Sequence, residues 1–175
     1  MKRFFAALLS AILCLSFLAT GIPAYAQESI SARTTLSGSA WAKISNIEIA
    51  IRSLNGLTVP GGGYFSFNDV VGPRSKAYGY QTAANGRGAK VTGGGVAQVA
   101  SALWLAIKDS DDIVILEKST YGKRYNQRYV ADAADAILTD YASGKDFRFR
   151  YTGDTSLTIY AYVEDGCLYC DVYES

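Results

Sequence analysis

Two segments of the chain carry apolar residues at helical spacing. The first, residues 39–55, predicts a helix that Ser39 caps and that Gly56 ends. The second, residues 96–107, predicts a helix whose polar positions Gln98 and Ser101 face away from the core. The apolar positions behind these predictions are Ile44, Ile47, Ile51 and Leu54 in the first helix, and Val96, Val99, Ala100, Leu103 and Ile107 in the second.

The remaining apolar pattern favours strands. A continuous apolar run predicts a buried strand, alternating runs predict further strands, and an acidic turn ending in Gly166 predicts a hairpin. Turn-forming residues between 68 and 90 predict a long irregular loop, of the kind that often carries function. The sum is an α+β fold, with two main helices packed on a largely antiparallel sheet. The expected strands are 64–67, 113–116, 147–151, 157–163 and 167–173, with a short helical segment near 131–140.

The chain begins with the pattern of a secretory signal. Lys2 and Arg3 precede an apolar run, and the small-x-small sequence at 24–26 predicts cleavage there. The alternative, a membrane anchor, needs about 20 apolar residues, and the run is short for that. We therefore expect a signal peptide at 1–26, a flexible leader at 27–38 and one domain at 39–175, in an exported protein without a stable membrane span.

Charge and composition narrow the classes of function. Of 17 basic residues the signal holds two, so the mature chain has 15 against 16 acidic residues, and the chain has no histidine. This balance argues against a nucleic-acid partner, which usually needs a strong basic excess. Tyrosine is abundant, with 13 residues in the whole chain. Tyrosine suits sugar or peptide binding, and it equally suits exposed β-strands.

The most informative stretch is 92–101, where three glycines run directly into the second predicted helix. Such a turn offers backbone N–H groups and the positive end of a helix dipole, which bind anions and lower the pKa of a cysteine placed there. Ala97 occupies that position, and there is no histidine to act as a general base. Alternatively, the glycines only permit positive φ or close packing. The candidate ligand-binding residues are Gly93, Gly94, Gly95, Gln98 and Ser101.

These pieces, in this order, resemble the VanW-like family of bacterial envelope proteins. Residues 60–74 are similar to the family signature PGEvFSFNdvvGpR, and residues 93–101 are similar to its signature GGGiCQvSs. Residues 46–56 and the tail, from 135 to the closing hairpin, match too, so that the resemblance covers 43–174. It implies a VanW-like domain, a place in the cell envelope and a link to glycopeptide-antibiotic resistance clusters.

The departures from the family pattern bear on chemistry. The family cysteine falls on Ala97, and the histidine-bearing stretch of the family falls on 118–123, which contains no histidine. The family order of cysteine, histidine-bearing strand and acidic residue is similar to that of papain-like hydrolases. On that account this chain has lost its nucleophile and its base together. On the alternative account the cysteine was never catalytic, and alanine fills a small buried space.

A basic segment and one arginine are further ligand-binding candidates. Residues 118–128 interleave basic residues with tyrosines and contain no acid, which suits teichoic-acid phosphate or peptidoglycan carboxylates. The alternative is a solvated loop that balances the acidic run at 109–112. Arg74 lies in a turn bounded by glycine and proline, where it binds a ligand or ties the loop to backbone carbonyls. The candidates named here are Arg74, Lys123, Arg124 and Tyr125.

Cys167 and Cys170 are the only cysteines of the mature chain. Export favours a disulfide, although residues three apart on one strand point to opposite faces, so a bond between them needs a bend. Core filling is the main alternative, and redox chemistry a lesser one. Two thiols without histidine do not make a zinc site, and no motif indicates a cofactor.

Two classes of function follow. The first is a secreted, non-catalytic domain that binds cell-wall polymer or an envelope protein partner. The second is a cell-wall-modifying hydrolase or transferase in which Asp69, Asp135 or Asp146 acts as acid or base. A structural or toxin-like domain without a polymer target is a third possibility.

Overall fold

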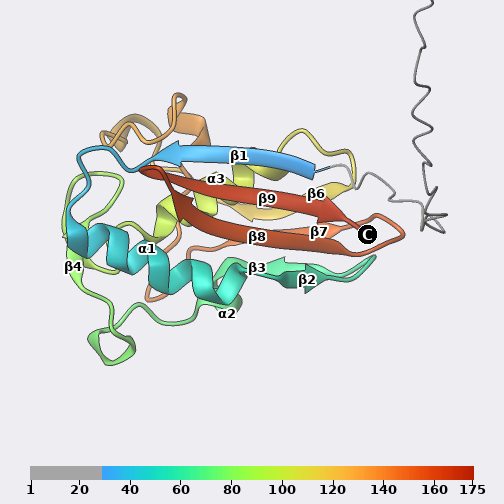
Figure 1. Cartoon of the computed structure of the whole chain (residues 1–175), viewed down its shortest axis with the longest axis horizontal. Helices are drawn as coiled ribbons and strands as arrows, with labels where there is room; N and C mark the ends of the chain where they lie inside the picture. The colour runs from blue at the N-terminus through green and yellow to red at the C-terminus, as the bar shows by residue number, and fades with distance from the viewer. Residues whose placement is uncertain (1–28) are drawn as a thin grey trace, which may run out of the picture.

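The computed structural model describes residues 29–175, so the signal-peptide prediction for 1–26 lies outside the described residues. Within this range the chain forms nine strands and three α-helices. Helices α1 and α3 pack against antiparallel sheets, as Figure 1 shows, and the predicted α+β class is confirmed.

The larger sheet has four strands in the order β1-β9-β8-β2, and all neighbours are antiparallel. The predicted hairpin between β8 and β9 is confirmed. Its turn residues Asp165 and Gly166 have φ values of 47° and 70°, as a two-residue turn with both central φ values positive requires. The strands are β1 (Ser29–Thr35), β2 (Leu57–Val59), β8 (Leu157–Glu164) and β9 (Cys167–Glu174).

The predicted flexible leader at 27–38 is wrong for most of its length. Residues 29–35 form β1, which pairs with β9 along seven positions. The small polar residues of this segment gave no strand signal. Their order comes from hydrogen bonds to a strand that lies more than 130 residues later in the chain.

The remaining strands form a second sheet in the order β3-β7-β6 and a separate β4-β5 hairpin, where the sequence predicted a single sheet. The strand at 113–116 was expected to be buried, but it belongs to β6, which lies at an edge and is half-buried on one face only. Val114 and Leu116 are each 47% exposed. The strands are β3 (Tyr64–Ser66), β4 (Thr82–Ala84), β5 (Lys90–Thr92), β6 (Ile113–Lys118) and β7 (Phe147–Tyr151).

The two main helices are α1 (Trp41–Leu54) and α3 (Val96–Ile107), and the predicted bounds of α3 are confirmed. Ser39 does not cap α1. The N-cap is Ala40, without a side-chain hydrogen bond, and Ser39 lies in the preceding turn, where its N–H donates to the carbonyl oxygen of Leu36. The segment expected to be an irregular loop contains the short helix α2 (Phe67–Val71), the 3-10 helix η1 (Lys76–Tyr78) and the β4-β5 hairpin. The segment at 131–140, expected to be helical, contains only the 3-10 helix η3 (Ala133–Asp135).

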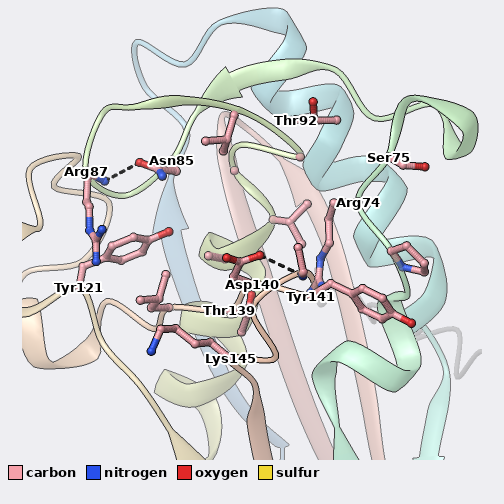
Figure 2. A pocket seen from close by; sticks show the side chains of 18 residues that line it. Arg74, Ser75, Asn85, Arg87, Thr92, Tyr121, Thr139, Asp140, Tyr141 and Lys145 are labelled. Atoms are coloured by element: carbon pink, nitrogen blue, oxygen red, sulfur yellow. Dashed lines mark hydrogen bonds between the residues drawn. The ribbon is translucent and has the colours of Figure 1, made fainter.

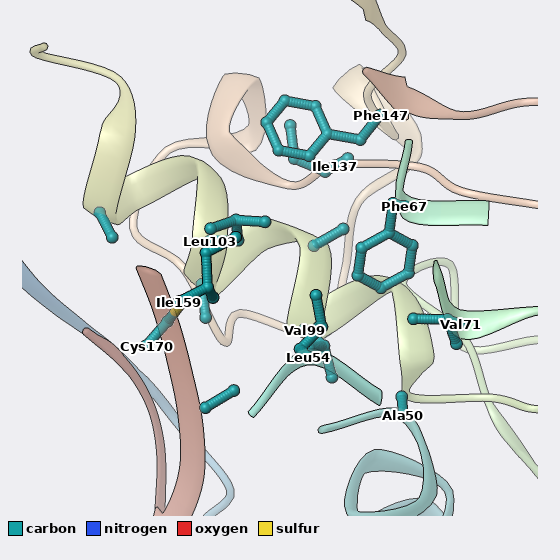
Figure 3. Packing of buried hydrophobic residues seen from close by; sticks show 14 of the residues in the cluster. Ala50, Leu54, Phe67, Val71, Val99, Leu103, Ile137, Phe147, Ile159 and Cys170 are labelled. Atoms are coloured by element: carbon teal, nitrogen blue, oxygen red, sulfur yellow. The ribbon is translucent and has the colours of Figure 1, made fainter. Parts of the chain in front are cut away.

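Helix α3 runs through the middle of the core, and ten of its twelve residues are buried. Ile159 and Cys170 of the four-stranded sheet lie on one side of it, while Phe147 and Phe67 lie on the other (Figure 3). A helix that is apolar nearly all round is typical of such a central position. No helix in the described part of the chain is long and apolar enough to cross a membrane.

Candidate functional site

A cleft of about 450 Å³ opens over the N-terminal end of α3. The loop after α2, the β4-β5 hairpin, the glycine turn and residues 138–145 meet around it, as Figure 2 shows. Its floor is small and apolar, and its walls carry three cations. The charged and aromatic residues of the lining are Arg74, Arg87, Tyr121, Asp140, Tyr141 and Lys145.

The three glycines of the turn are required by packing. Gly93 and Gly95 have φ values of +77° and +106°, which favour glycine. A Cβ at Gly93 would lie 2.5 Å from Cβ of Arg74, and one at Gly95 would lie 2.7 Å from Cγ of Lys43. A Cβ at Gly94 would overlap the carbonyl oxygen of Ala83. The packing account of the glycines is therefore confirmed.

The polar groups of this turn bond within the protein. The N–H of Gly93 donates to the carbonyl oxygen of Gln81 at 3.0 Å, and the N–H of Gly94 donates to that of Val91 at 3.1 Å. The buried Asn46 side chain donates to the carbonyl oxygens of Gln81 and Gly94, each at 2.9 Å, and accepts from the N–H of Gln81 at 2.7 Å. The expectation that these two glycine N–H groups are free for an anion is wrong. The turn instead fixes where α3 begins.

The floor of the cleft includes Ala97, which is 9% exposed and lies in a buried cluster with Tyr121 and Tyr129. The Tyr121 ring packs directly against Gly86, where there is no room for a Cβ. Burial raises the pKa of the Tyr121 hydroxyl, so it remains protonated at neutral pH and able to donate a hydrogen bond. The methyl group of Ala97 and the phenol of Tyr121 thus both line the cleft.

Arg74 crosses one wall of the cleft. Its Nη1 donates to Oδ1 of Asn68 at 2.6 Å, and its guanidinium carbon lies 5.5 Å from the ring centre of Phe67 and 5.9 Å from that of Tyr141. Burial lowers the pKa of Arg74 from its ordinary value, because the nearby protein replaces water around the charge. The group still carries its positive charge at neutral pH.

Asn68 is in turn held by the buried carboxylate of Asp146. Asp146 accepts from the N–H of Asn68 at 2.9 Å, from its own neighbour Phe147 at 2.7 Å and from the Ser66 hydroxyl at 2.6 Å. The side-chain amide of Asn68 also donates to the carbonyl oxygen of Lys145 at 3.0 Å. We call Ser66, Asn68 and Asp146 the support network, because it fixes the orientation of Arg74.

Comparison with known proteins identifies the family of this chain. The family model described as VanW like protein matches residues 42–173. The chain belongs to the VanW-like family. It is 30% identical over 133 residues to "Uncharacterized protein YoaR" of Bacillus subtilis (strain 168), an alignment that covers 74% of this chain and 42% of that protein. The chain thus spans about two fifths of the length of this relative. No solved structure matches it.

The segments that carry the VanW-like resemblance meet at this cleft. Residues 60–74 supply Arg74 and two members of the support network, and the tail supplies the third, Asp146. Residues 93–101 supply the glycine turn and Ala97. Tyr121 comes from the stretch on which the histidine-bearing part of the family falls. The structure therefore places Ala97 and one residue of the stretch at 118–123, Tyr121, in the same buried cluster.

The residues predicted for the site from the segment at 118–128 lie elsewhere, whereas Arg74 lines the cleft as predicted. Lys123 and Arg124 are exposed in η2 (Gly122–Arg124) and do not line the cleft. The Tyr125 hydroxyl accepts from the N–H of Val130 at 2.7 Å, so this side chain braces its own loop. The cations that line the cleft together with Arg74 are Arg87 and Lys145. Sequence reasoning missed both, although Arg87 follows the predicted Asn-Gly turn and Lys145 precedes Asp146.

Gln98 and Ser101 also do not line the cleft, and the prediction that they face away from the core is wrong. Gln98 is 1% exposed and donates to the Thr34 hydroxyl and the Thr35 carbonyl oxygen, each at 2.9 Å, which ties α3 to β1. Ser101 is fully buried and accepts from the N–H of Ile137 at 2.9 Å. Both are polar because the neighbouring segments offer backbone and hydroxyl partners.

The three carboxylates named for an alternative catalytic site are dispersed. Asp69 is exposed, while Asp146 belongs to the support network. Asp135 accepts from Nε1 of Trp104 at 2.7 Å and pairs with Lys108 at 3.2 Å. The cleft carboxylate is Asp140, whose oxygens accept from Ala142 and Ser143 of its own turn.

Cys167 and Cys170 are free thiols on β9, so the expected bond between them is not formed. Cys170 belongs to the core, and burial raises the pKa of its thiol. An extended strand directs the two side chains to opposite faces, which prevents the bond. Residues 29–175 contain no group of three or more cysteine, aspartate or glutamate side chains placed to hold a metal ion.

Proposed function

We propose that this chain is a secreted, non-catalytic VanW-like domain that binds an anionic polymer of the bacterial cell envelope, peptidoglycan or teichoic acid, in the cleft above α3. The observation that carries the proposal is the composition of this cleft. Arg74, Arg87 and Lys145 surround a floor in which Ala97 stands where the family resemblance places a cysteine. Cationic and aromatic walls suit phosphate or carboxylate groups carried on a polymer.

The absence of catalysis is part of the same proposal. A cysteine nucleophile needs a thiol and a base, and the chain offers a methyl group at Ala97 and no histidine anywhere. The dispersed carboxylates give no pair of acid and base at the cleft. We therefore expect the purified protein to leave the composition of a muropeptide digest unchanged. Turnover of a muropeptide that is lost on substitution of Asp135 or Asp140 would support the alternative, a carboxylate-dependent enzyme.

The first test is sedimentation of the mature protein, residues 27–175, with intact sacculi and with sacculi stripped of teichoic acid. We expect binding that weakens as salt rises, because exposed charges are screened. Loss of binding on stripping identifies teichoic acid, and retention identifies peptidoglycan. Binding to neither preparation would overturn the polymer proposal and favour a protein partner in the envelope.

Matched double variants locate the binding surface. Arg87→Gln with Lys145→Gln removes two exposed cations of the cleft, and Lys123→Gln with Arg124→Gln removes two exposed cations outside it. We expect the first pair to lower sacculus binding about tenfold, and the second to change it less than about threefold. The reverse ranking would move the site to the basic segment at 118–128.

A further inference from the structure

Two side chains that line the cleft hold a buried polar atom with no hydrogen-bond partner. Within residues 29–175, these are Nη2 of Arg74 and the hydroxyl of Thr139. A buried polar group without a partner costs free energy, and the cost is larger when the group is charged. Two such groups at one cleft therefore either destabilise the fold without a function or donate hydrogen bonds to an acceptor that a ligand supplies.

Arg74 cannot relieve its own position by swinging away. Its Nη1 is fixed to Asn68 at 2.6 Å, and Asn68 is fixed by Asp146 and by the carbonyl oxygen of Lys145. On the other side the backbone of Gly93 packs against the start of the side chain, where even a Cβ would lie 2.5 Å from Cβ of Arg74. The guanidinium is thus held in one orientation before any ligand arrives, which reduces the entropic cost of binding.

No carboxylate of the described residues forms a salt bridge with this guanidinium, which interacts with the charges of Asp146 and Asp140 only from beyond contact distance. The salt bridge found in residues 29–175 joins Lys108 to Asp135, away from the cleft. Asp140 is the carboxylate of the lining, and its two oxygens accept from the N–H of Ala142 at 3.1 Å and from the Ser143 hydroxyl at 2.7 Å. The support network thus supplies Arg74 with one neutral acceptor and leaves its charge uncompensated by contact.

We propose that Nη2 of Arg74 and the hydroxyl of Thr139 form an oxyanion subsite, which binds one carboxylate or phosphate group of the ligand. Arginine presents its donors in a planar fork, and here one half of the fork bonds to Asn68 while the other half, Nη2, is buried without a partner. Thr139 adds a hydroxyl donor from the opposite segment of the cleft. Arg87 and Lys145 are exposed and attract the anion without fixing it. The inference deepens the proposed function, on which it rests only in taking this cleft as the ligand site.

The test is an NMR titration of the mature chain with inorganic phosphate and, separately, with acetate at constant ionic strength. We expect saturable shifts at Arg74 and in residues 138–145 with at least one of the two anions. Stronger binding of phosphate indicates the phosphates of teichoic acid, and stronger binding of acetate indicates the carboxylates of wall peptides. Absence of saturable shifts at the cleft with both anions would overturn the subsite.

Arg74→Lys keeps the charge and removes the fork, so we expect it to weaken anion binding about tenfold. The matched control Arg87→Lys makes the same change at an exposed arginine of the same cleft, and we expect less than about a threefold effect. Equal effects of the two substitutions would reduce the site to general electrostatic attraction and overturn the inference.

Thr139→Val covers the case in which Arg74→Lys fails to fold, since it removes one hydroxyl at nearly constant shape. We expect it to weaken anion binding between about threefold and tenfold, without lowering the thermal unfolding temperature, because the hydroxyl that it removes has no hydrogen-bond partner in the free protein. No change in anion binding would contradict the role of Thr139. Anion binding at Arg74 together with no binding to sacculi would support the subsite and overturn the proposed function. The experiments therefore distinguish failure of the subsite from failure of the proposed function.

Discussion

Two groups of buried polar atoms lie on either side of the Arg74 guanidinium, and they differ in whether they have partners. In the support network, the Asp146 carboxylate accepts three hydrogen bonds, and the side chain of Asn68 takes part in two more. Toward the cleft, Nη2 of Arg74 and the hydroxyl of Thr139 have none. The Arg74 side chain thus has one nitrogen bonded to the support network, which stabilises the fold, and one nitrogen that the fold leaves without a partner. The comparison separates residues that build the site from residues that face a ligand.

The largest effect is expected from breaking the support network. Asp146→Ala leaves the N–H groups of Asn68 and Phe147 and the Ser66 hydroxyl without their acceptor, so we expect a loss of about 3 kcal/mol in the free energy of unfolding. Urea unfolding measures it. The control is Asp69→Ala, an exposed carboxylate of α2, with an expected loss below about 0.5 kcal/mol. Similar losses for the two variants would show that the support network stabilises the fold no more than an exposed carboxylate does.

A smaller loss of stability, without loss of binding, is expected at Gln98. Gln98→Ala removes both hydrogen bonds to β1 and leaves a space at a fully enclosed position, which costs about 2 kcal/mol. Hydrogen exchange should become faster in β1 while anion binding at Arg74 is retained. The control is Gln127→Ala, since Gln127 bonds only to the neighbouring exposed Asn126. Slowed or unchanged exchange in β1 would contradict the role of Gln98 in holding β1 against α3.

A larger side chain at the floor of the cleft should reduce ligand binding with little loss of stability. Ala97→Leu places a larger apolar side chain at the 9% exposed floor position, at an expected cost of about 1 kcal/mol from crowding against Tyr121. We expect sacculus binding to fall by about tenfold, because the new side chain occupies the space of the ligand. Ala97→Ser, which adds one atom, is the control. Full binding by Ala97→Leu would place the ligand outside the cleft.

The smallest effect at neutral pH concerns the tyrosines beneath the cleft. Burial raises the pKa of Tyr121 and of Tyr129 above the ordinary 10.0. The unfolded chain then releases these protons first, so the contribution of these two groups to the free energy of unfolding is constant below about pH 9 and falls as pH rises beyond about 10. Tyr129→Phe should flatten this alkaline decrease. An unchanged pH dependence would show that Tyr129 does not contribute.

The candidate site was only partly predictable from sequence, and particular residues show why. The glycine turn, Ala97 and Arg74 stand in signatures that are local in the chain. Gly93, Gly95, Ala97 and Arg74 line the cleft, while Gly94 packs against the backbone of Ala83. Lys123 and Arg124 were chosen because basic residues cluster around them, but clustering in sequence does not place side chains in a cleft. Arg87 and Lys145 are separated by 58 residues and become neighbours of one cleft only through the fold.

The sequence by itself determined the features that depend on neighbours along the chain. Periodicity fixed the bounds of α3, alternation identified β7, β8 and β9, and the Asp-Gly turn identified their hairpin. Only the tertiary structure decided that β1 is a strand, that Gln98 is buried and that Asp146 supports Arg74. Each of these depends on hydrogen bonds between residues at least 60 positions apart, such as Asn68 and Asp146, whose separation is 78. Local propensity carries no information about such partners, because folding alone brings them within bonding distance.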